Sequence, residues 1–247
     1  MARIPRIYCP GTLQAGGLIT LPQSAARHTR KVLRLRAGDR LRVFDGAGHE
    51  HEAVLASDGT EAAARIGAAL KPVSESRLSL TLVQGISRGD RMDMVVQKAT
   101  ELGVKRIVPV LTARSVVRLS RDRAEQRRQH WRAIAASACE QCGRSVLPDV
   151  AVPRTLDEAL ADEPRAGVRL MPSAGADIAL SAIRPDSAEF CLLIGPEGGL
   201  DADEENRAAS VGFLPVSMGP RVLRTETAAL VALAVCQTLW GDFNATQ

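Results

Sequence analysis

The hydrophobic pattern of the first 72 residues is typical of short β-strands. Apolar residues recur in brief stretches that are separated by glycine, aspartate and serine turns. We expect five strands there: Ile7–Cys9, Leu18–Leu21, Leu41–Phe44, Glu52–Ala56 and Ala62–Leu70. Short strands at this regular spacing favour a small β-barrel.

One helical segment interrupts these strands. Ser24 can cap its start. Its inward face is predicted from four residues that recur at helical spacing: Ala25, His28, Val32 and Leu35. Its other face carries four bases: Arg27, Arg30, Lys31 and Arg34.

The pattern changes after a polar, proline-containing break at residues 71–76. We place a domain boundary there, with one domain over residues 1–72 and a second over residues 73–247. Strands then alternate with helices, which predicts βαβ units, a parallel sheet and the α/β fold class. The expected strands are Leu78–Gln84, Val104–Leu111, a short one between Pro148 and Pro153, Val168–Met171, Phe190–Ile194 and Phe213–Met218. The expected helices are Asp90–Leu102, Arg121–Cys142, Leu156–Ala161 and Thr227–Trp240.

Three features mark where helices start, stop and pack. Gly103 directly follows one expected helix and acts as its stop signal. Asp201 can cap another helix, with Glu204 three residues later, as in a capping box. The final helix is apolar on nearly every side. It is therefore either buried centrally or packed against another subunit.

The composition is that of a globular protein. Hydrophobic residues make up 45% and charged residues 24% of the chain. No apolar run approaches the roughly 18 residues needed to cross a bilayer, and the N-terminus lacks the apolar region of a secretory signal. We therefore expect a cytoplasmic protein. The five cysteines are odd in number and scattered, which argues against a disulfide framework.

Positive charge is concentrated in two parts of the chain. Residues 1–72 hold 11 basic and 6 acidic residues, whereas the remaining residues are nearly balanced. Residues 112–132 hold seven arginines against two acids. Such patches favour a polyanion such as RNA or DNA, and a solvated arginine-rich surface is the alternative. Because His28 lies among bases without a second ligand nearby, we assign it to RNA contact or to structure, not to a metal.

A glycine-rich stretch, Gly195-Pro196-Glu197-Gly198-Gly199, directly follows the most apolar strand. Glycines let backbone N–H groups approach a ligand, and open α/β sheets bind ligands beyond the carboxyl ends of their strands. The stretch matches neither the dinucleotide fingerprint nor the P-loop, and Glu197 would repel a phosphate. It is therefore a candidate loop for a neutral or cationic cofactor, and a plain strand-to-helix turn is the alternative.

The stretch Leu223–Thr227, LRTET, opens the final helix and is the second candidate. Thr225 or Glu226 can cap the free N–H groups of that helix. Arg224 and Glu226 form a surface pair in one interpretation and bind substrate in the other, if they lie in a pocket.

A Cys-x-x-Cys pair, Cys139 and Cys142, lies in the middle of the long expected helix. Without a second such pair or a thioredoxin-like context, zinc and redox roles are disfavoured. Glu140 and Arg144 are one turn apart in the same region and can pair on one polar strip.

Two further polar sets are weaker candidates. Lys98 and Glu101 are three residues apart on an expected helix. Arg114 and Ser115 follow the carboxyl end of an expected strand. On the pattern alone, a solvated helix face is the better explanation.

In combination, these motifs resemble one family, the bacterial 16S ribosomal RNA uracil-N3 methyltransferases of the RsmE type, in the SPOUT superfamily. The motifs that carry the resemblance are RIPRIY at 3–8, H-x2-K-VLR at 28–34, QKATELGV at 97–104, EQxGR at 140–144, GPEGG at 195–199 and LRTETA at 223–228. The chain departs from the family in two places. Ala113 stands where the family usually has glutamate, and Cys142 fills the variable position of EQxGR.

The resemblance implies a fold and a cofactor. Residues 1–72 would form a PUA-like, RNA-binding β-barrel, and residues 73–247 a parallel α/β domain with a trefoil knot near its end. The enzyme would be a homodimer with the final helix at the interface. It would need no metal, and the knot loops would hold S-adenosylmethionine. The implied cofactor-binding residues are Leu170, Met171, Ile194, Gly195, Pro196, Gly198, Gly199, Met218, Gly219, Leu223, Arg224 and Thr225.

The implied substrate is a uridine of 16S rRNA, either free or within the small ribosomal subunit. Uracil N3 bears a proton, so methylation needs a base and a group that stabilises the uracil anion. Arg224 is the candidate for the anion, and Glu226, Glu197 and Glu140 are candidate bases in that order. The implied RNA-binding residues are Arg3, Arg6, Arg27, His28, Arg30, Lys31, Arg34, Lys98, Arg114 and Arg144.

Two other functions are compatible with parts of the sequence. A non-catalytic RNA-binding assembly factor would explain the basic residues, but not a second glycine loop paired with LRTETA. A SPOUT enzyme that modifies a ribose 2′-hydroxyl or guanine N1 would share the fold, but the N-terminal motifs and LRTETA disfavour it.

Overall fold

The computed structural model describes residues 4–58, 61–115, 120–162 and 167–244. The chain divides into two units. The first contains residues 1–75 and 136–147, and the second contains residues 76–135 and 148–247. The division falls close to the expected boundary at residue 72. It differs in that residues 136–147 group with the N-terminal unit, because the end of a long helix and the segment after it contact that unit.

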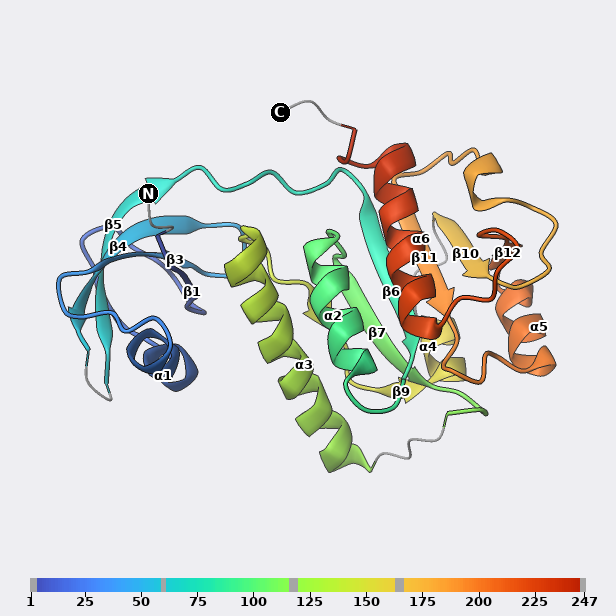
Figure 1. Ribbon diagram of the computed structural model, residues 1–247, viewed down its shortest axis with the longest axis horizontal. Helices are drawn as coiled ribbons and strands as arrows, with labels where there is room; N and C mark the ends of the chain where they lie inside the picture. Colours follow the sequence, from blue (N-terminus) through green and yellow to red (C-terminus); the bar gives the residue numbers. More distant parts are fainter. Residues whose placement is uncertain (1–3, 59–60, 116–119, 163–166, 245–247) are drawn as a thin grey trace. The chain divides into compact units, whose positions relative to one another are not determined.

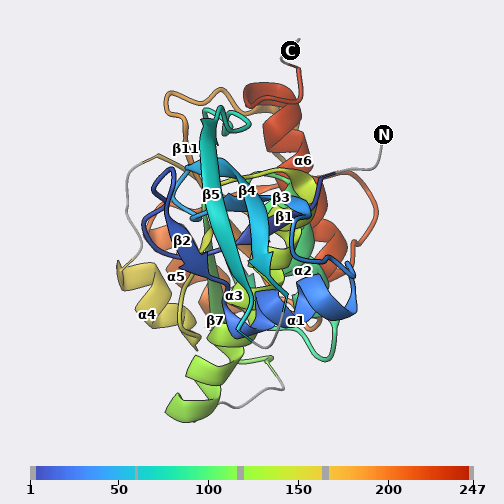
Figure 2. The same ribbon diagram turned by 90° about the vertical axis from the view of Figure 1, so that its left-hand side faces the viewer.

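The first unit is built on a five-stranded sheet with the order β1-β3-β4-β5-β2. Its strands are β1 (Arg6–Tyr8), β2 (Leu18–Thr20), β3 (Arg40–Phe44), β4 (Glu50–Ser57) and β5 (Ala63–Leu70). Strands β1 and β3 are parallel and the other neighbours are antiparallel. The two longest strands, β4 and β5, lie side by side in Figure 2. All five expected strands are confirmed, although no pairing among the described residues joins β1 to β2 to close a barrel.

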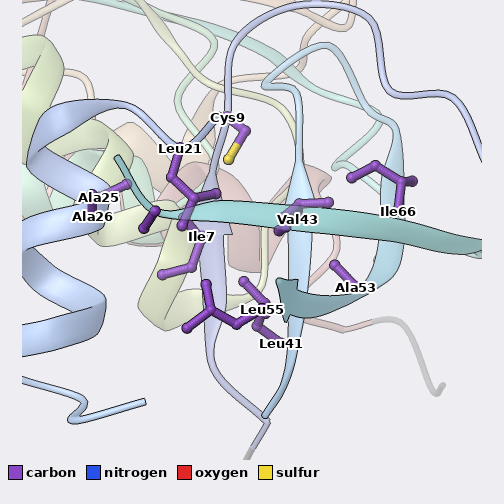
Figure 3. Close-up of a cluster of buried hydrophobic side chains, with 12 residues drawn as sticks. Ile7, Cys9, Leu21, Ala25, Ala26, Leu41, Val43, Ala53, Leu55 and Ile66 are labelled. Carbon is purple, nitrogen blue, oxygen red and sulfur yellow. The ribbon is translucent and has the colours of Figure 1, made fainter. Parts of the chain in front are cut away.

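Helix α1 (Gln23–Lys31) covers the core of this unit. Figure 3 shows apolar side chains of β1, β3 and β4 gathered beside it, among them Ile7, Val43 and Leu55. The helix is shorter than expected, and its N-cap is Pro22 rather than Ser24. Ala25, Ala26 and Thr29 face inward, whereas Val32 lies past the helix and is 64% exposed. The helical spacing placed Ala25 correctly and Val32 wrongly, because the chain leaves the helix at Lys31, while Leu35 beyond the helix still packs partly buried against the core.

The second unit contains a parallel sheet with the order β12-β10-β11-β6-β7-β8, in which β9 also pairs with β7. The strands are β6 (Ser79–Gly85), β7 (Arg106–Leu111), β8 (Asp149–Val150), β9 (Arg154–Thr155), β10 (Val168–Pro172), β11 (Glu189–Ile194) and β12 (Leu214–Val216). The helices are α2 (Arg91–Glu101), α3 (Arg121–Cys142), α4 (Leu156–Asp162), the short η1 (Leu180–Ala182), α5 (Ala202–Ser210) and α6 (Thr225–Trp240). The expected parallel α/β sheet is confirmed, and β9 is the strand that the sequence pattern did not predict.

Helices cover both faces of this sheet. On one face, α4 and α5 pack on residues of β6, β7, β10 and β11. On the other face, α6 contacts α2, β6 and β11, and Figure 1 shows α2 and α6 side by side there. Trp240 of α6 stacks on Phe190 of β11, with ring centroids 5.0 Å apart. A central strand covered on both faces explains the unbroken apolar run of β11.

The predicted stop signal of α2 and the predicted start signal of α5 are both present. Gly103 has a φ of 83°, a left-handed conformation that ends α2 at little cost. The Asp201 side chain accepts the Glu204 N–H, and the Glu204 carboxylate accepts the Asp201 N–H, so the capping box is complete. The trefoil knot stays a prediction.

Candidate functional site

The parallel strands bring three loops to one edge of the sheet. Strands β10 and β11 end at Pro172 and Ile194, and β6 ends between β11 and β7 at Gly85. We call residues 195–199 the glycine loop, and residues 223–227, which lead into α6, the LRTET segment. Both border a cavity of about 550 Å³, a size typical of small-molecule sites.

The cavity is lined by the loops after β10 and β11, by the LRTET segment and its neighbours, and by one residue each of α2 and α5. Its lining residues are Arg91, Met171, Pro172, Ser173, Ala174, Ile194, Gly195, Pro196, Glu197, Gly199, Leu200, Glu205, Val222, Leu223, Arg224, Thr225, Glu226 and Ala228. A smaller hollow of about 130 Å³ shares Pro172–Ala174 and Val222-Leu223 with it and adds Met218, Gly219 and Arg221. The glycine loop and the LRTET segment therefore meet at one place.

Most of the predicted cofactor residues line one of these two hollows. Two do not: Leu170 and Gly198. Leu170 is fully buried within the unit, so its side chain belongs to the core. Gly198 lies against Arg114: a Cβ added there would be 3.1 Å from the Arg114 Cβ. The loop after β10 also contributes, through Pro172, Ser173 and Ala174.

Thr225 joins the LRTET segment to the glycine loop. Its hydroxyl donates to the Gly195 carbonyl at 2.6 Å and accepts the Gln84 side-chain N–H at 2.9 Å. Gln84 is fully buried at the end of β6 and also donates to the Gly85 carbonyl. The N-cap of α6 is Arg224, without a side-chain cap. The prediction that Thr225 or Glu226 caps the helix is therefore wrong, because both side chains are directed to the site instead.

Gly85 allows the end of β6 to approach the glycine loop. A Cβ added at Gly85 would overlap the Pro196 nitrogen and come within 2.8 Å of the Gly195 carbonyl carbon. Both are backbone atoms, so the overlap could be relieved only by moving the loop. The shape of the cavity wall thus depends on a glycine outside the predicted motifs.

Glu197 holds the glycine loop to the start of α2. Its Oε1 accepts the Arg88 N–H at 3.0 Å and Arg91 Nη1 at 2.7 Å. Burial acts to raise the pKa of Glu197. The Arg88 N–H, the Arg91 hydrogen bond and the Arg91 charge outweigh burial, and they hold that pKa below its usual range. An engaged carboxylate with a lowered pKa is a weak proton acceptor, so the geometry favours an anchoring role for Glu197 over that of a base.

Glu226 still has a carboxylate oxygen that can accept a hydrogen bond. It is only 9% exposed, it lines the cavity, and its Oε2 has no hydrogen-bond partner among the described residues. Its Oε1 lies 3.9 Å from Arg91 Nε. A buried acceptor without a partner is costly unless a ligand or water satisfies it. Arg224, at the N-cap of α6, is exposed at the same cavity.

The charged residues of the cavity favour a cationic ligand. Three carboxylates line it against two guanidinium groups: Glu197, Glu205 and Glu226 against Arg91 and Arg224. The excess of negative charge agrees with the expectation that the glycine loop does not bind phosphate.

Arg91 and Gln84 are site residues that the sequence pattern did not reveal. Arg91 is the first residue of α2, where a positive charge opposes the helix dipole. This unfavourable position could have marked Arg91 as a functional residue. Gln84 carried a weaker signal, as the single amide in the apolar run LSLTLVQ.

The predicted RNA-binding residues of the first unit fall into two groups. One group lies in or just after α1: Arg27, Arg30, Lys31 and Arg34 are exposed and His28 is half-buried. Arg34 has a φ of 55°, a left-handed conformation that is uncommon outside glycine. Arg3 lies outside the described residues.

Arg6 and Arg144 form the other group, and both are buried. Arg6 donates to both carboxylate oxygens of Glu50 at 3.1 and 2.8 Å and to the Arg144 carbonyl. Arg144 bonds to Glu75 at 2.7 Å. The prediction that Arg6 and Arg144 bind RNA is corrected here. Their guanidinium groups hold β1, β4 and the segment after α3 together, because an unpaired buried charge would be strongly destabilising.

The two predicted RNA contacts of the second unit also have partners within the unit. Lys98 Nζ bonds to Glu101 Oε1 at 2.8 Å, a helix-surface pair that leaves the side chain partly exposed. Arg114 Nη1 donates to the Gly198 and Leu200 carbonyls. Arg114 thus lies on the glycine loop.

The surroundings of the Cys-x-x-Cys pair and of Glu140 indicate a role in the fold. Burial, the main cause, raises the pKa of the Cys139 thiol to about 12, so the thiol remains protonated at neutral pH. Glu140 Oε1 accepts the Tyr8 N–H at 3.0 Å, and burial raises its pKa. Within the described ranges, no group of three or more metal-ligating side chains occurs.

Two family models match the chain. The one described as RNA methyltransferase domain covers residues 74–237, and the one described as RNA methyltransferase PUA domain covers residues 21–67. The first spans more than half of the chain and contains every residue that lines the cavity. In the described part of the chain, no helix is both long and apolar enough to cross a membrane.

Curated relatives match over nearly the full length. Ribosomal RNA small subunit methyltransferase E of Buchnera aphidicola subsp. Acyrthosiphon pisum (strain APS) is 30% identical over 244 residues, which cover 98% of this chain and 96% of the relative. The protein of that name from Bacillus subtilis (strain 168) is 32% identical over 84% of each chain.

Solved structures agree with these relatives. The ribosomal RNA small subunit methyltransferase E of Neisseria gonorrhoeae, solved with S-adenosylmethionine, is 42% identical with a TM-score of 0.91, over 98% of this chain and all of that one. A putative methyltransferase of Legionella pneumophila, also with S-adenosylmethionine, is 38% identical with a TM-score of 0.93 over the same shares. The motifs, the parallel sheet and these relatives together show that the chain belongs to the ribosomal RNA small subunit methyltransferase E family.

Proposed function

We propose that this protein transfers a methyl group from S-adenosylmethionine to N3 of a uridine in the 16S rRNA of the small ribosomal subunit. One observation carries the proposal. The glycine loop and the LRTET segment meet around a single acidic cavity at the carboxyl edge of a parallel sheet. Two relatives with the same fold were solved with that cofactor.

The residues present fit S-adenosylmethionine. The cofactor carries a sulfonium and an ammonium group, and the cavity has an excess of carboxylates. The glycine loop is tightly folded: a Cβ at Gly195 would come within 2.9 Å of the Leu200 nitrogen. When bound, the cofactor supplies an electrophilic methyl group. We assign its binding to the cavity-lining residues of the loops after β10 and β11 and of the LRTET segment.

The chain's own residues activate the uracil. Glu226 Oε2, buried and without a partner among the described residues, accepts the N3 proton. The exposed guanidinium of Arg224 stabilises the negative charge that then develops on O2 or O4 of the uracil. We rank Glu197 below Glu226 as the base, because Arg88 and Arg91 already engage its carboxylate. Outside the duplex stack, a flipped uridine would present its N3 edge to these groups.

We further propose that RNA binds the basic surface on and after α1. A protein that neutralises phosphates releases counterions, so its affinity falls with salt. We expect the double variant Arg30→Glu/Arg34→Glu to bind 16S rRNA fragments more weakly. The plot of the logarithm of its affinity against the logarithm of the salt concentration should be less steep, by about 0.7–0.9 for each phosphate that the variant no longer neutralises. Fluorescence anisotropy between about 50 and about 300 mM salt measures this slope.

The matched control for this prediction changes the net charge equally. Arg184→Glu/Arg207→Glu reverses two arginines that lie outside α1 and the cavity. It should leave the slope near the wild-type value. Equal slopes for all three proteins would remove the α1 surface from the RNA interface.

We also propose a homodimer in which α6 contributes to the interface. Leu230, Val231, Ala234 and Val235 are only half-buried within the unit, and Leu239 is 42% exposed. Together they leave an apolar surface on a helix that is otherwise packed. Sedimentation equilibrium should give twice the mass of 26.4 kDa. We place the enzyme in the cytoplasm, where ribosomal subunits are assembled.

Nucleoside mapping tests the proposed function directly. In a strain that lacks the gene, we expect one 16S rRNA fragment to lose 3-methyluridine in mass spectrometry. The intact gene should restore it, and the gene carrying Arg224→Ala should not. Loss of a 2′-O-methyl nucleoside or of 1-methylguanosine instead would assign another SPOUT reaction. An unchanged methylation map would favour a non-catalytic assembly factor.

A further inference from the structure

Residues 112–115, which follow β7, form a locked turn. The Thr112 N–H donates to Ser115 Oγ at 3.0 Å, the two hydroxyl oxygens are 3.0 Å apart, and the Ser115 N–H donates to the Thr112 carbonyl at 2.9 Å. We call these residues the β7 turn. In the sheet, β7 is separated from β11 by β6, so residues after β7 can reach the loop after β11 only across the end of β6.

Arg114 spans that gap. Its Nη1 donates to the Gly198 carbonyl at 2.8 Å and to the Leu200 carbonyl at 3.2 Å. The stem of the side chain lies on the glycine loop, since a Cβ at Gly198 would approach the Arg114 Cβ to 3.1 Å. One cation therefore holds two carbonyls at the end of the glycine loop, both turned toward the β7 turn.

The backbone of the β7 turn makes a second, independent tie. The Ala113 N–H donates to Glu204 Oε1 at 2.8 Å, while Glu204 Oε2 accepts the Asp201 N–H at 3.0 Å. The carboxylate that caps α5 thus also binds the β7 turn. Because this bond uses only a backbone N–H, it survives replacement of the Arg114 side chain.

These contacts fix how the peptide groups of the glycine loop are oriented. Gly199 and Leu200 line the cavity. The Gly199 N–H donates to the Pro196 carbonyl at 2.9 Å, and the Asp201 N–H is taken by Glu204. Arg114, which does not line the cavity, holds both the Gly198 and the Leu200 carbonyl through its Nη1. An unheld loop could turn them inward and change the wall that a cofactor meets.

We propose that Arg114 is a positioning residue for the cofactor-binding wall and not an RNA contact. It acts through the Gly198 and Leu200 carbonyls. The inference rests on the proposed function in so far as the cavity binds S-adenosylmethionine. Arginine suits the task because its planar group can donate to two carbonyls at once.

The test is cofactor binding in the absence of RNA. Arg114→Met keeps the aliphatic stem over Gly198 and removes every donor. Isothermal titration of the full-length protein with S-adenosylmethionine should give a Kd about tenfold higher than wild type. At saturating cofactor, kcat should stay within about threefold, because Arg114 does not touch the reacting atoms. Arg114→Lys, which can still donate to one carbonyl, should recover part of the affinity.

Arg184→Met is the matched control. Arg184 also donates from Nη1 to two backbone carbonyls, those of Ser181 and Ile183, but it does not line the cavity. Its replacement should leave cofactor affinity unchanged. Melting temperatures of all variants, measured without cofactor, exclude unfolding as the cause of weaker binding. Should Arg114→Met melt early, the comparison of Arg114→Lys with Arg184→Met decides in its place.

The outcomes separate the inference from the proposed function. Wild-type protein that fails to bind S-adenosylmethionine would refute the function itself. Wild-type binding with an unchanged Kd in Arg114→Met would overturn the positioning role alone. If that variant instead binds RNA more weakly with a reduced salt slope, Arg114 returns to the RNA surface.

Discussion

Arg224→Ala is expected to lower the rate of methyl transfer by about two to three orders of magnitude, while the protein still binds S-adenosylmethionine within a few-fold of wild type. Arg224 is exposed at the N-cap of α6, on the wall of the cavity. In the mechanism that we propose, its guanidinium stabilises charge that exists only once uracil begins to lose its N3 proton. An interaction made chiefly in the transition state affects kcat more than ground-state binding.

Single-turnover transfer from radiolabelled cofactor to 16S rRNA measures the rate, and isothermal titration measures cofactor affinity. The control is Arg207→Ala, which removes an exposed arginine that pairs with Asp157 away from the cavity. Near-normal turnover in Arg224→Ala would refute the role of Arg224. A cofactor Kd raised as much as the rate falls would make Arg224 a cofactor ligand instead.

Glu226→Gln is expected to slow the reaction by about 10²–10⁴-fold, because the amide keeps the shape of the side chain but cannot take a proton. Glu226 is 9% exposed and its Oε2 has no partner among the described residues, so it has an acceptor free for the substrate. Single-turnover rates at saturating cofactor and enzyme, followed from about pH 6 to about pH 9, measure the chemical step.

Glu197→Gln provides the comparison between the two candidate bases. Glu197 is engaged by the Arg88 N–H and by Arg91, so its amide variant should chiefly weaken cofactor binding. A rate loss confined to Glu197→Gln would exchange the two roles. Equal and small losses in both variants would show that neither carboxylate removes the proton.

The sequence predicted most elements of the fold because their signals are local. Periodicity placed the strand ends to within a few residues, and the Asp201–Glu204 capping box and the Gly103 stop are signals contained in short stretches. The failures have the same origin. Strand β9 has only two residues and no period to detect. The end of α1 is set by how the following residues pack, so the spacing of Val32 was misleading.

The sequence predicted the two main segments of the candidate site but not the residues that hold them in place. The glycine loop and the LRTET segment lie about thirty residues apart and carry recognisable motifs. Gln84 bonds to Thr225 and Arg91 bonds to Glu197, and each pair is more than one hundred positions apart in the sequence. No local pattern reports such contacts. Arg6 was misassigned for the same reason, since its partner Glu50 lies 44 residues away.

The bond between Gln84 and Thr225 has a consequence for the order in which this protein matures. The two residues are 141 positions apart, and Thr225 also fixes Gly195. The cofactor cavity therefore cannot take its final shape until the chain has been synthesised past residue 225 and α6 has docked. Contacts of such long range form slowly during folding. A nascent chain truncated before α6 should hence be unable to hold cofactor.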